Sequence, residues 1–178
     1  ATLTSLELRD NYNFTIQIFS WISATAKNVA SLDLRNSCSD LDLTQGMEQL
    51  VSLGGLKMLY LGPTNIFVAV ERFAESIQCH MANLIVLYLD GILGMDDQGI
   101  SDILSFATIL EEITLIDMDF GTRTIEALCS MVPNTEKVTL VGSSQLRDAD
   151  LRCLTKTCKF LSEISIQKCT AITSEGFN

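Results

Sequence analysis

A short pattern of apolar positions, leucine-x-x-leucine-x-leucine, recurs along the whole chain. Seven copies are present, and isoleucine, valine or threonine sometimes replaces leucine. The three positions of each copy are Leu3, Leu6, Leu8; Val29, Leu32, Leu34; Leu56, Leu59, Leu61; Leu84, Leu87, Leu89; Leu110, Ile113, Leu115; Thr135, Val138, Leu140; and Leu161, Ile164, Ile166. The middle residues of successive copies lie 25 to 28 residues apart. A regular period of this length predicts a repeat protein.

Each repeat unit contains two periodicities. The last two apolar positions of a copy are separated by one residue, which predicts a short strand with both side chains facing the core. Apolar residues then return at helical spacing. In the last three complete units they are Ile100, Ile103, Leu104, Ala107; Ile125, Leu128, Cys129, Val132; and Leu151, Leu154, Cys158. Each unit is therefore predicted to be a strand, a turn, an amphipathic helix and a return loop.

A single unit cannot bury both the inner face of its strand and the apolar face of its helix, whereas stacked units can. We therefore predict an α/β solenoid of about seven repeats, a right-handed horseshoe with a parallel sheet on the concave face and helices on the convex face. Residues 1–178 are predicted to form this single domain. The chain opens directly in a strand and stops at Asn178, where a seventh helix would begin. We expect either a fragment or an array whose ends are covered by partners.

The repeat residues resemble the leucine-rich repeat superfamily. The period near 26 residues is similar to that of the cysteine-containing subtype, which occurs in F-box substrate receptors and in proteins resembling ribonuclease inhibitor. The subtype pattern is matched best at Cys158, Leu161, Ile164, Ile166, Cys169, Ile172, Thr173 and Gly176, and in part at Met95, Asp96, Asp97, Gly99 and Ile100. The first three units depart from it, because Pro63-Thr64-Asn65 replaces the cysteine region. The resemblance implies a leucine-rich repeat solenoid.

The resemblance also implies a protein-protein interaction module that binds a partner on its concave face. The most populated class with these repeats is the F-box-type ubiquitin ligase receptor, whose repeats recognise the substrate. A Skp-type adaptor would then bind through a module that is not in this chain. Three alternatives stay open: the ligand-sensing repeat domain of an innate-immune nucleotide-binding receptor, a repeat-type inhibitor, and a structural assembly factor.

The side chains that alternate with the inward-facing leucines are expected on the concave face, in columns whose members lie ~4.8 Å apart. We predict that the partner-binding residues are Met58, Tyr60, Val86, Tyr88, Asp90, Glu112, Thr114, Ile116 and Asp117. Tyr60 and Tyr88 form the centre of this prediction, because exposed tyrosine beside apolar residues is typical of a binding hot spot. The alternative is a cross-strand pair that only stabilises the sheet.

Charge changes this picture in one region. The chain has 12 Lys and Arg against 22 Asp and Glu, a net charge of −10, which argues against nucleic acid or an anionic membrane as partner. Nine of the acidic residues, and no Lys or Arg, lie between Phe73 and Thr122. Several of them reach the concave face or its rim, where they would attract a basic partner segment unless they are simply solvated. Near the first strand, Arg9 and Arg35 are flanked by Glu7 and Asp33, and we expect an internal salt network there.

The composition favours an intracellular protein, cytoplasmic or nuclear. Hydrophobic residues make up 47% of the 178 residues, but no apolar run reaches the ~18 residues of a membrane helix. No segment resembles a signal or transit peptide. The six cysteines are expected to be reduced and mostly buried, because the predicted core is large enough to need no disulfides.

The sequence offers little for catalysis. His80 is the only histidine, and we expect it on the surface or at the end of the third helix. No Cys-x-x-Cys, His-x-x-x-His or phosphate-binding loop is present. We therefore predict that the protein is not an enzyme, with no catalytic residues, no metal ligands and no cofactor.

Overall fold

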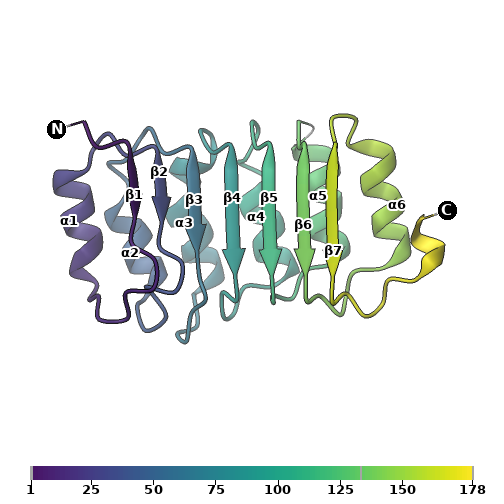
Figure 1. Cartoon of the computed structure of the whole chain (residues 1–178), viewed down its shortest axis with the longest axis horizontal. Coiled ribbons are helices and arrows are strands. Elements are labelled where there is room, and N and C mark those ends of the chain that lie inside the picture. Colours follow the sequence, from purple (N-terminus) through teal and green to yellow (C-terminus); the bar gives the residue numbers. More distant parts are fainter. Residues whose placement is uncertain (1, 133, 178) are drawn as a thin grey trace.

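The computed structural model describes residues 2–132 and 134–177, in which seven parallel strands form one open sheet in sequence order. The strands are β1 (Ser5–Glu7), β2 (Ser31–Asp33), β3 (Met58–Leu61), β4 (Val86–Asp90), β5 (Glu112–Ile116), β6 (Lys137–Val141) and β7 (Glu163–Gln167). Figure 1 shows them side by side across the length of the molecule. Each is joined to the next by a helical connection, as parallel strands require.

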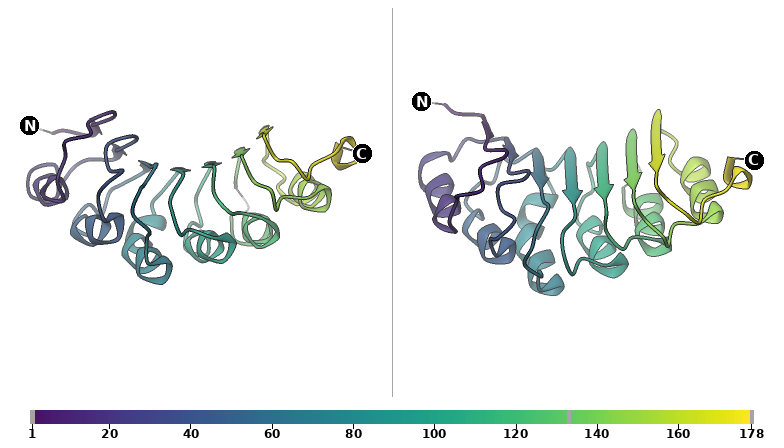
Figure 2. Two further views of the ribbon diagram at one scale, coloured as in Figure 1. Left: turned by 90° about the horizontal axis from the view of Figure 1, so that it is seen from below. Right: turned by 60° about the horizontal axis from the view of Figure 1, so that its bottom comes forward.

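The helices lie together on the other side of the molecule. They are α1 (Gln17–Thr25), α2 (Leu43–Gln49), α3 (Val70–Met81), α4 (Asp97–Leu104), α5 (Thr122–Met131) and α6 (Asp148–Thr157), and a 3-10 helix, η1 (Ser174–Phe177), follows β7. Figure 2 shows a gently curved array with the strands on the inside of the curve and the helices on the outside. The predicted α/β repeat solenoid, with the sheet on the concave face, is confirmed.

The strand register aligns the repeat leucines into buried columns. Leu59 pairs with Leu87 and Leu87 with Ile113, and each of the three is at most 1% exposed. Along β4 and β5 the inward residues are buried and the alternate residues are half-buried on the other face. This is the alternation that the sequence pattern predicts. In the outermost strands, which have one neighbour each, Leu6 and Ile164 are only partly buried.

The helices close the core from the convex side. Ile100, Ile103 and Leu104 of α4 are at most 1% exposed, as their helical spacing predicts. Large aromatic side chains fill the space between sheet and helices, and Phe19 and Phe73 are fully buried. Burial of these apolar surfaces is the main force that holds successive repeats together.

Two carboxylates connect one repeat to the next at helix starts. Asp97, the first residue of α4, accepts hydrogen bonds from the backbone N–H groups of Gly121 (2.7 Å), Thr124 (2.9 Å) and Arg123 (3.0 Å). It therefore caps the start of α5, whose first N–H groups have no partner within the helix. Burial alone would raise the pKa of Asp97, but these hydrogen bonds outweigh burial and lower the pKa. Asp148, the first residue of α6, likewise accepts hydrogen bonds from Thr173, the residue before η1.

The Asp148 contact follows the same geometry. One carboxylate oxygen accepts from the backbone N–H of Thr173 at 2.8 Å, and the other accepts from the Thr173 hydroxyl at 2.6 Å. These bonds lower the pKa of Asp148. Both carboxylates thus accept hydrogen bonds from groups of the repeat that follows their own.

The expectation of a surface location for His80 is wrong. The residue lies in the last turn of α3, as expected for a helix end, but it is only 1% exposed. Its helix position is four residues after Ser76 and three after Ile77, both buried, so it falls on the apolar face. Burial lowers the pKa of His80, and the backbone of Leu53 offsets only part of that effect.

This buried imidazole makes stability depend on pH. The unfolded chain binds the proton near the ordinary histidine pKa of about 6.5, whereas the folded chain binds it only at lower pH. Stability is therefore expected to be fully present above pH ~6.5 and to decrease as the pH falls through the lowered pKa of His80. Urea unfolding of the native chain and of His80→Gln at pH 7.5, 6.0 and 5.0 tests this. The loss between pH 7.5 and 5.0 should be smaller in the variant, and parallel pH profiles would contradict it.

Candidate functional site

The predicted binding residues lie together in the middle of the sheet's concave face. The register pairs Met58 with Val86 and Val86 with Glu112 in one column. A second column contains Tyr60, Tyr88 and Thr114, and a third pairs Asp90 with Ile116. Asp117 directly follows β5 and is exposed. All nine residues thus form one continuous surface on β3, β4 and β5, and their role in binding stays a prediction.

Tyr60 and Tyr88 stand beside each other with their ring centres 6.0 Å apart and their planes inclined by 41°. The guanidinium of Arg35 lies over both rings, 4.9 Å from the centre of Tyr60 and 4.8 Å from the centre of Tyr88. Cations at this distance are attracted to the electron-rich ring faces. We call Arg35, Tyr60 and Tyr88 the tyrosine–arginine platform.

Asp33 of β2 forms an ion pair with Arg35 and so fixes the position of Arg35 in the platform. Its carboxylate is 2% exposed and accepts from the guanidinium of Arg35 at 2.6 Å and from that of Arg9 at 2.7 Å. Burial would raise the pKa of Asp33, but the bonds with Arg35 and the charge of Arg9 lower it overall. The pKa of Arg35 is raised, chiefly by its hydrogen bond with Asp33. The expected internal salt network of Arg9, Arg35, Glu7 and Asp33 is therefore present, with Arg9 also 3.2 Å from Glu7.

The acidic residues on this face differ in their surroundings. Glu112 forms an ion pair of 2.7 Å with Lys137 of β6, so a basic partner would have to compete with that lysine. Among the described residues Asp90 forms no ion pair. Burial and the nearby charge of Asp117 raise its pKa, and Tyr88 and the charge of Arg35 offset only part of that effect. Burial and the charge of Asp90 raise the pKa of Tyr88 as well. Negative charge is thus least compensated at the end of β4 and just after β5.

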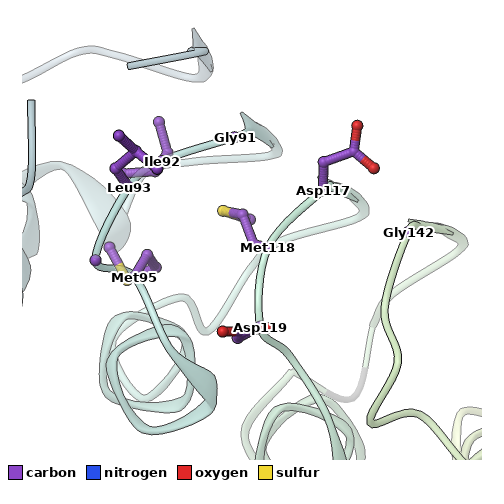
Figure 3. A pocket seen from close by; sticks show the side chains of 9 residues that line it. Gly91, Ile92, Leu93, Met95, Asp117, Met118, Asp119 and Gly142 are labelled. Atoms are coloured by element: carbon purple, nitrogen blue, oxygen red, sulfur yellow. The ribbon is translucent and has the colours of Figure 1, made fainter. Parts of the chain in front are cut away.

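A pocket of about 280 Å³ lies at this end of the strands. We call it the rim pocket. It is lined by Gly91, Ile92, Leu93, Gly94, Met95, Asp117, Met118, Asp119 and Gly142. Figure 3 shows it between the loop after β4 and the loop after β5, with the side chains of Met118 and Asp119 directed into the gap. The carboxylate of Asp117 points to the other side, toward Gly142.

Sequence reasoning missed the central position of Arg35 and the rim pocket. It assigned Arg35 only to a salt network with Arg9, Glu7 and Asp33. Gly62 has no side chain, so the guanidinium has room to extend across β3 and reach both tyrosines. A glycine next to an arginine in a concave column was the signal that could have indicated this contact.

The cysteines are free thiols in the structure, and the expectation of burial is met only in part. Cys38, Cys158 and Cys169 are buried, Cys129 and Cys153 are half-buried, and Cys79 is exposed on α3. Burial raises the pKa of Cys38 to about 12, so this thiol is unreactive at neutral pH. The sulfurs of Cys129 and Cys153 lie 3.5 Å apart on neighbouring helices.

Within residues 2–132 and 134–177, no group of three or more His, Cys, Asp or Glu is arranged to hold a metal ion. No helix in those same ranges is long and apolar enough to cross a membrane. No protein-family model matches the chain. The fold and the site therefore define the protein as a parallel βα repeat solenoid with an ordered aromatic and charged surface on its open sheet face.

Proposed function

We propose that the protein is a leucine-rich repeat module that binds another protein on its concave face, with the tyrosine–arginine platform as the centre of the interface. The platform is the observation that supports this function. Tyrosine and arginine are the residue types enriched in binding hot spots, and here they are held in place before any partner arrives. Nothing in the packing of the repeats requires aromatic side chains on this face.

The surroundings of the platform fit an interface as well. Met58, 38% exposed, and the half-buried Val86 flank the tyrosines with apolar surface. Charged groups surround this apolar centre, among them Arg9, Asp90 and Glu112. An apolar and aromatic centre with a polar rim is the usual composition of a protein interface.

As the particular class, we propose the substrate-recognition repeats of an intracellular F-box-type ubiquitin ligase receptor. The support is the cysteine-containing repeat pattern around Cys158–Gly176, together with the free thiols, which fit a reducing compartment. In this class the repeats hold the substrate, and a separate module binds a Skp-type adaptor.

The test is capture of partners by the full-length protein in cells, followed by calorimetry with each purified partner. Tyr60→Ala/Tyr88→Ala should weaken the substrate interaction by about tenfold or more, because two large contact surfaces are lost. The free energy of unfolding should fall by only about 1–2 kcal/mol, since the tyrosines are half-buried and their contacts are those of exposed cross-strand and cation–π pairs.

The third tyrosine provides a matched control. Tyr12 is 70% exposed and lies outside the strands, so Tyr12→Ala should leave binding unchanged. Equal affinity of the double variant and the native chain would remove the platform from the interface. An adaptor of the Skp type should co-purify with the full-length protein and with both variants of it, and its absence would exclude the ubiquitin ligase class while leaving the binding module in place.

A further inference from the structure

The rim pocket has an apolar wall that continues onto an exposed apolar surface. Its wall is formed by Ile92, Leu93, Met95 and Met118. Leu93 is 39% exposed and Phe67, from the loop after β3, is 74% exposed. Phe67 lies beside Gly94, one of the residues that line the pocket, because a side-chain carbon added at Gly94 would lie only 3.1 Å from its ring. Large apolar side chains this exposed, in a row beside a pocket, are typical of an interaction site.

Two acidic residues line the same pocket, Asp117 and Asp119. The carboxylates of Asp117 and Asp119 form no hydrogen bond or ion pair with any described residue. Burial and the nearby charge of Asp117 raise the pKa of Asp90, and Tyr88 and the charge of Arg35 offset only part of that effect. The sequence between Phe73 and Thr122 contains no Lys or Arg. A cation supplied by a partner would therefore relieve repulsion that the free protein retains.

The backbone around the pocket is shaped to keep these groups in place. Gly142 leaves the space for the Asp117 carboxylate, because a side-chain carbon at Gly142 would lie 2.1 Å from its Oδ1 atom. Asp117 itself has a φ of 47°, in the left-handed region that aspartate tolerates better than most residues. Gly94, with a φ of 89°, lets the loop after β4 pass close under Phe67.

We propose that the rim pocket binds a lysine or arginine side chain of the partner protein, carried on an extended segment whose neighbouring apolar side chain packs on Phe67 and Leu93. The aliphatic part of the basic side chain contacts Leu93 and Met118, and its charged end lies near Asp119, whose side chain is directed into the gap, while Asp117 attracts it from the side that faces Gly142. This inference rests on the proposed function and adds to it the chemistry of the partner. Gly91, which lines the pocket, is three residues after Tyr88, at most about 10 Å along the chain, so one segment can cover the platform and the pocket.

The pocket can be tested with a defined probe before any natural partner is known. The probe is a short synthetic peptide in which arginine and leucine alternate with glycine. Two matched peptides replace every arginine with glutamate or every leucine with serine. Binding is followed by NMR of the methionine, leucine, isoleucine and valine methyl groups of the protein. The signals of Leu93, Met95 and Met118 should move on addition of the arginine–leucine peptide and less on addition of the serine peptide.

Two double variants, each of which removes two negative charges, distinguish binding in the pocket from general electrostatic attraction of the peptide to the protein. Asp117→Asn/Asp119→Asn should raise the dissociation constant of the arginine–leucine peptide by about tenfold or more. It should fold normally, because neither carboxylate has a hydrogen-bond or ion-pair partner among residues 2–132 and 134–177. Glu75→Gln/Glu126→Gln changes exposed residues of α3 and α5 and should alter the dissociation constant by less than about twofold.

This inference would be overturned by equal weakening in both double variants, by equal binding of the glutamate peptide, or by no response of Met95 and Met118 to any peptide. Movement of the Val86 signals with Met118 unchanged would place the basic segment over the strands and would also overturn it. None of these outcomes decides the proposed function, which depends on the separate partner measurements with Tyr60 and Tyr88.

Discussion

Leu87→Ala is expected to lower the free energy of unfolding by about 2–5 kcal/mol. Leu87 is 1% exposed and lies in the central strand, between Leu59 on β3 and Ile113 on β5. Truncation removes three buried carbons and leaves a cavity whose walls belong to three repeats. Those walls cannot all move inward, because each strand is fixed by hydrogen bonds to its neighbours. Urea unfolding followed by circular dichroism measures the loss.

The matched variant is Leu3→Ala. Leu3 occupies a leucine position of the first repeat but is 39% exposed. The expected loss is about 1 kcal/mol or less, the usual range for surface positions. Equal losses for Leu3→Ala and Leu87→Ala would contradict a structure in which each repeat is stabilised by the repeats on both sides.

Gly62→Ala is expected to destabilise the protein by about 2–4 kcal/mol. Two effects combine at this position. Gly62 has a φ of 104°, which residues with a side chain rarely adopt, and a side-chain carbon there would lie 1.8 Å from the carbonyl oxygen of Asp90. That oxygen belongs to the backbone of the neighbouring repeat, so it cannot rotate away as a flexible side chain could.

Gly55→Ala is the control for this substitution. A side-chain carbon at Gly55 meets no atom within 4 Å, and its φ is not in the left-handed region. The change in stability should stay within about 0.5 kcal/mol, as for ordinary surface substitutions. Thermal or urea unfolding compares the two, and a similar effect of both alanines would show that the contact of Gly62 with the Asp90 backbone is unimportant.

The sequence was sufficient to predict the solenoid because the relevant forces are local and periodic. Each copy of the leucine pattern specifies one strand, and the constant spacing places Leu59, Leu87 and Ile113 in one column without further information. The same arithmetic predicts that Tyr60 and Tyr88 are neighbours, which the register confirms. In a repeat protein, distance along the chain converts directly into distance in space.

The contacts that the sequence did not predict involve side-chain direction and loop shape. Column assignments say which residues are adjacent but not that Arg35 turns sideways over two aromatic rings. The helical spacing of His80 after Phe73 and Ile77 places it on the apolar face of α3, but its polar residue type suggested exposure. The rim pocket is formed by loops whose positive φ values at Gly91, Gly94 and Asp117 cannot be read from leucine spacing.

Because Asp97 and Asp148 each bind the repeat that follows their own, the order of the repeats matters for their hydrogen bonding. Each carboxylate is encoded in one unit and used by the next, where it meets the N–H groups at the start of a helical segment. A unit moved or duplicated by genetic recombination would carry its aspartate to a new neighbour and leave the old neighbour's amides without an acceptor. Units of this chain are therefore not interchangeable parts, although their leucines are nearly identical. Shuffled arrays should need these junction residues transplanted together with the unit that follows.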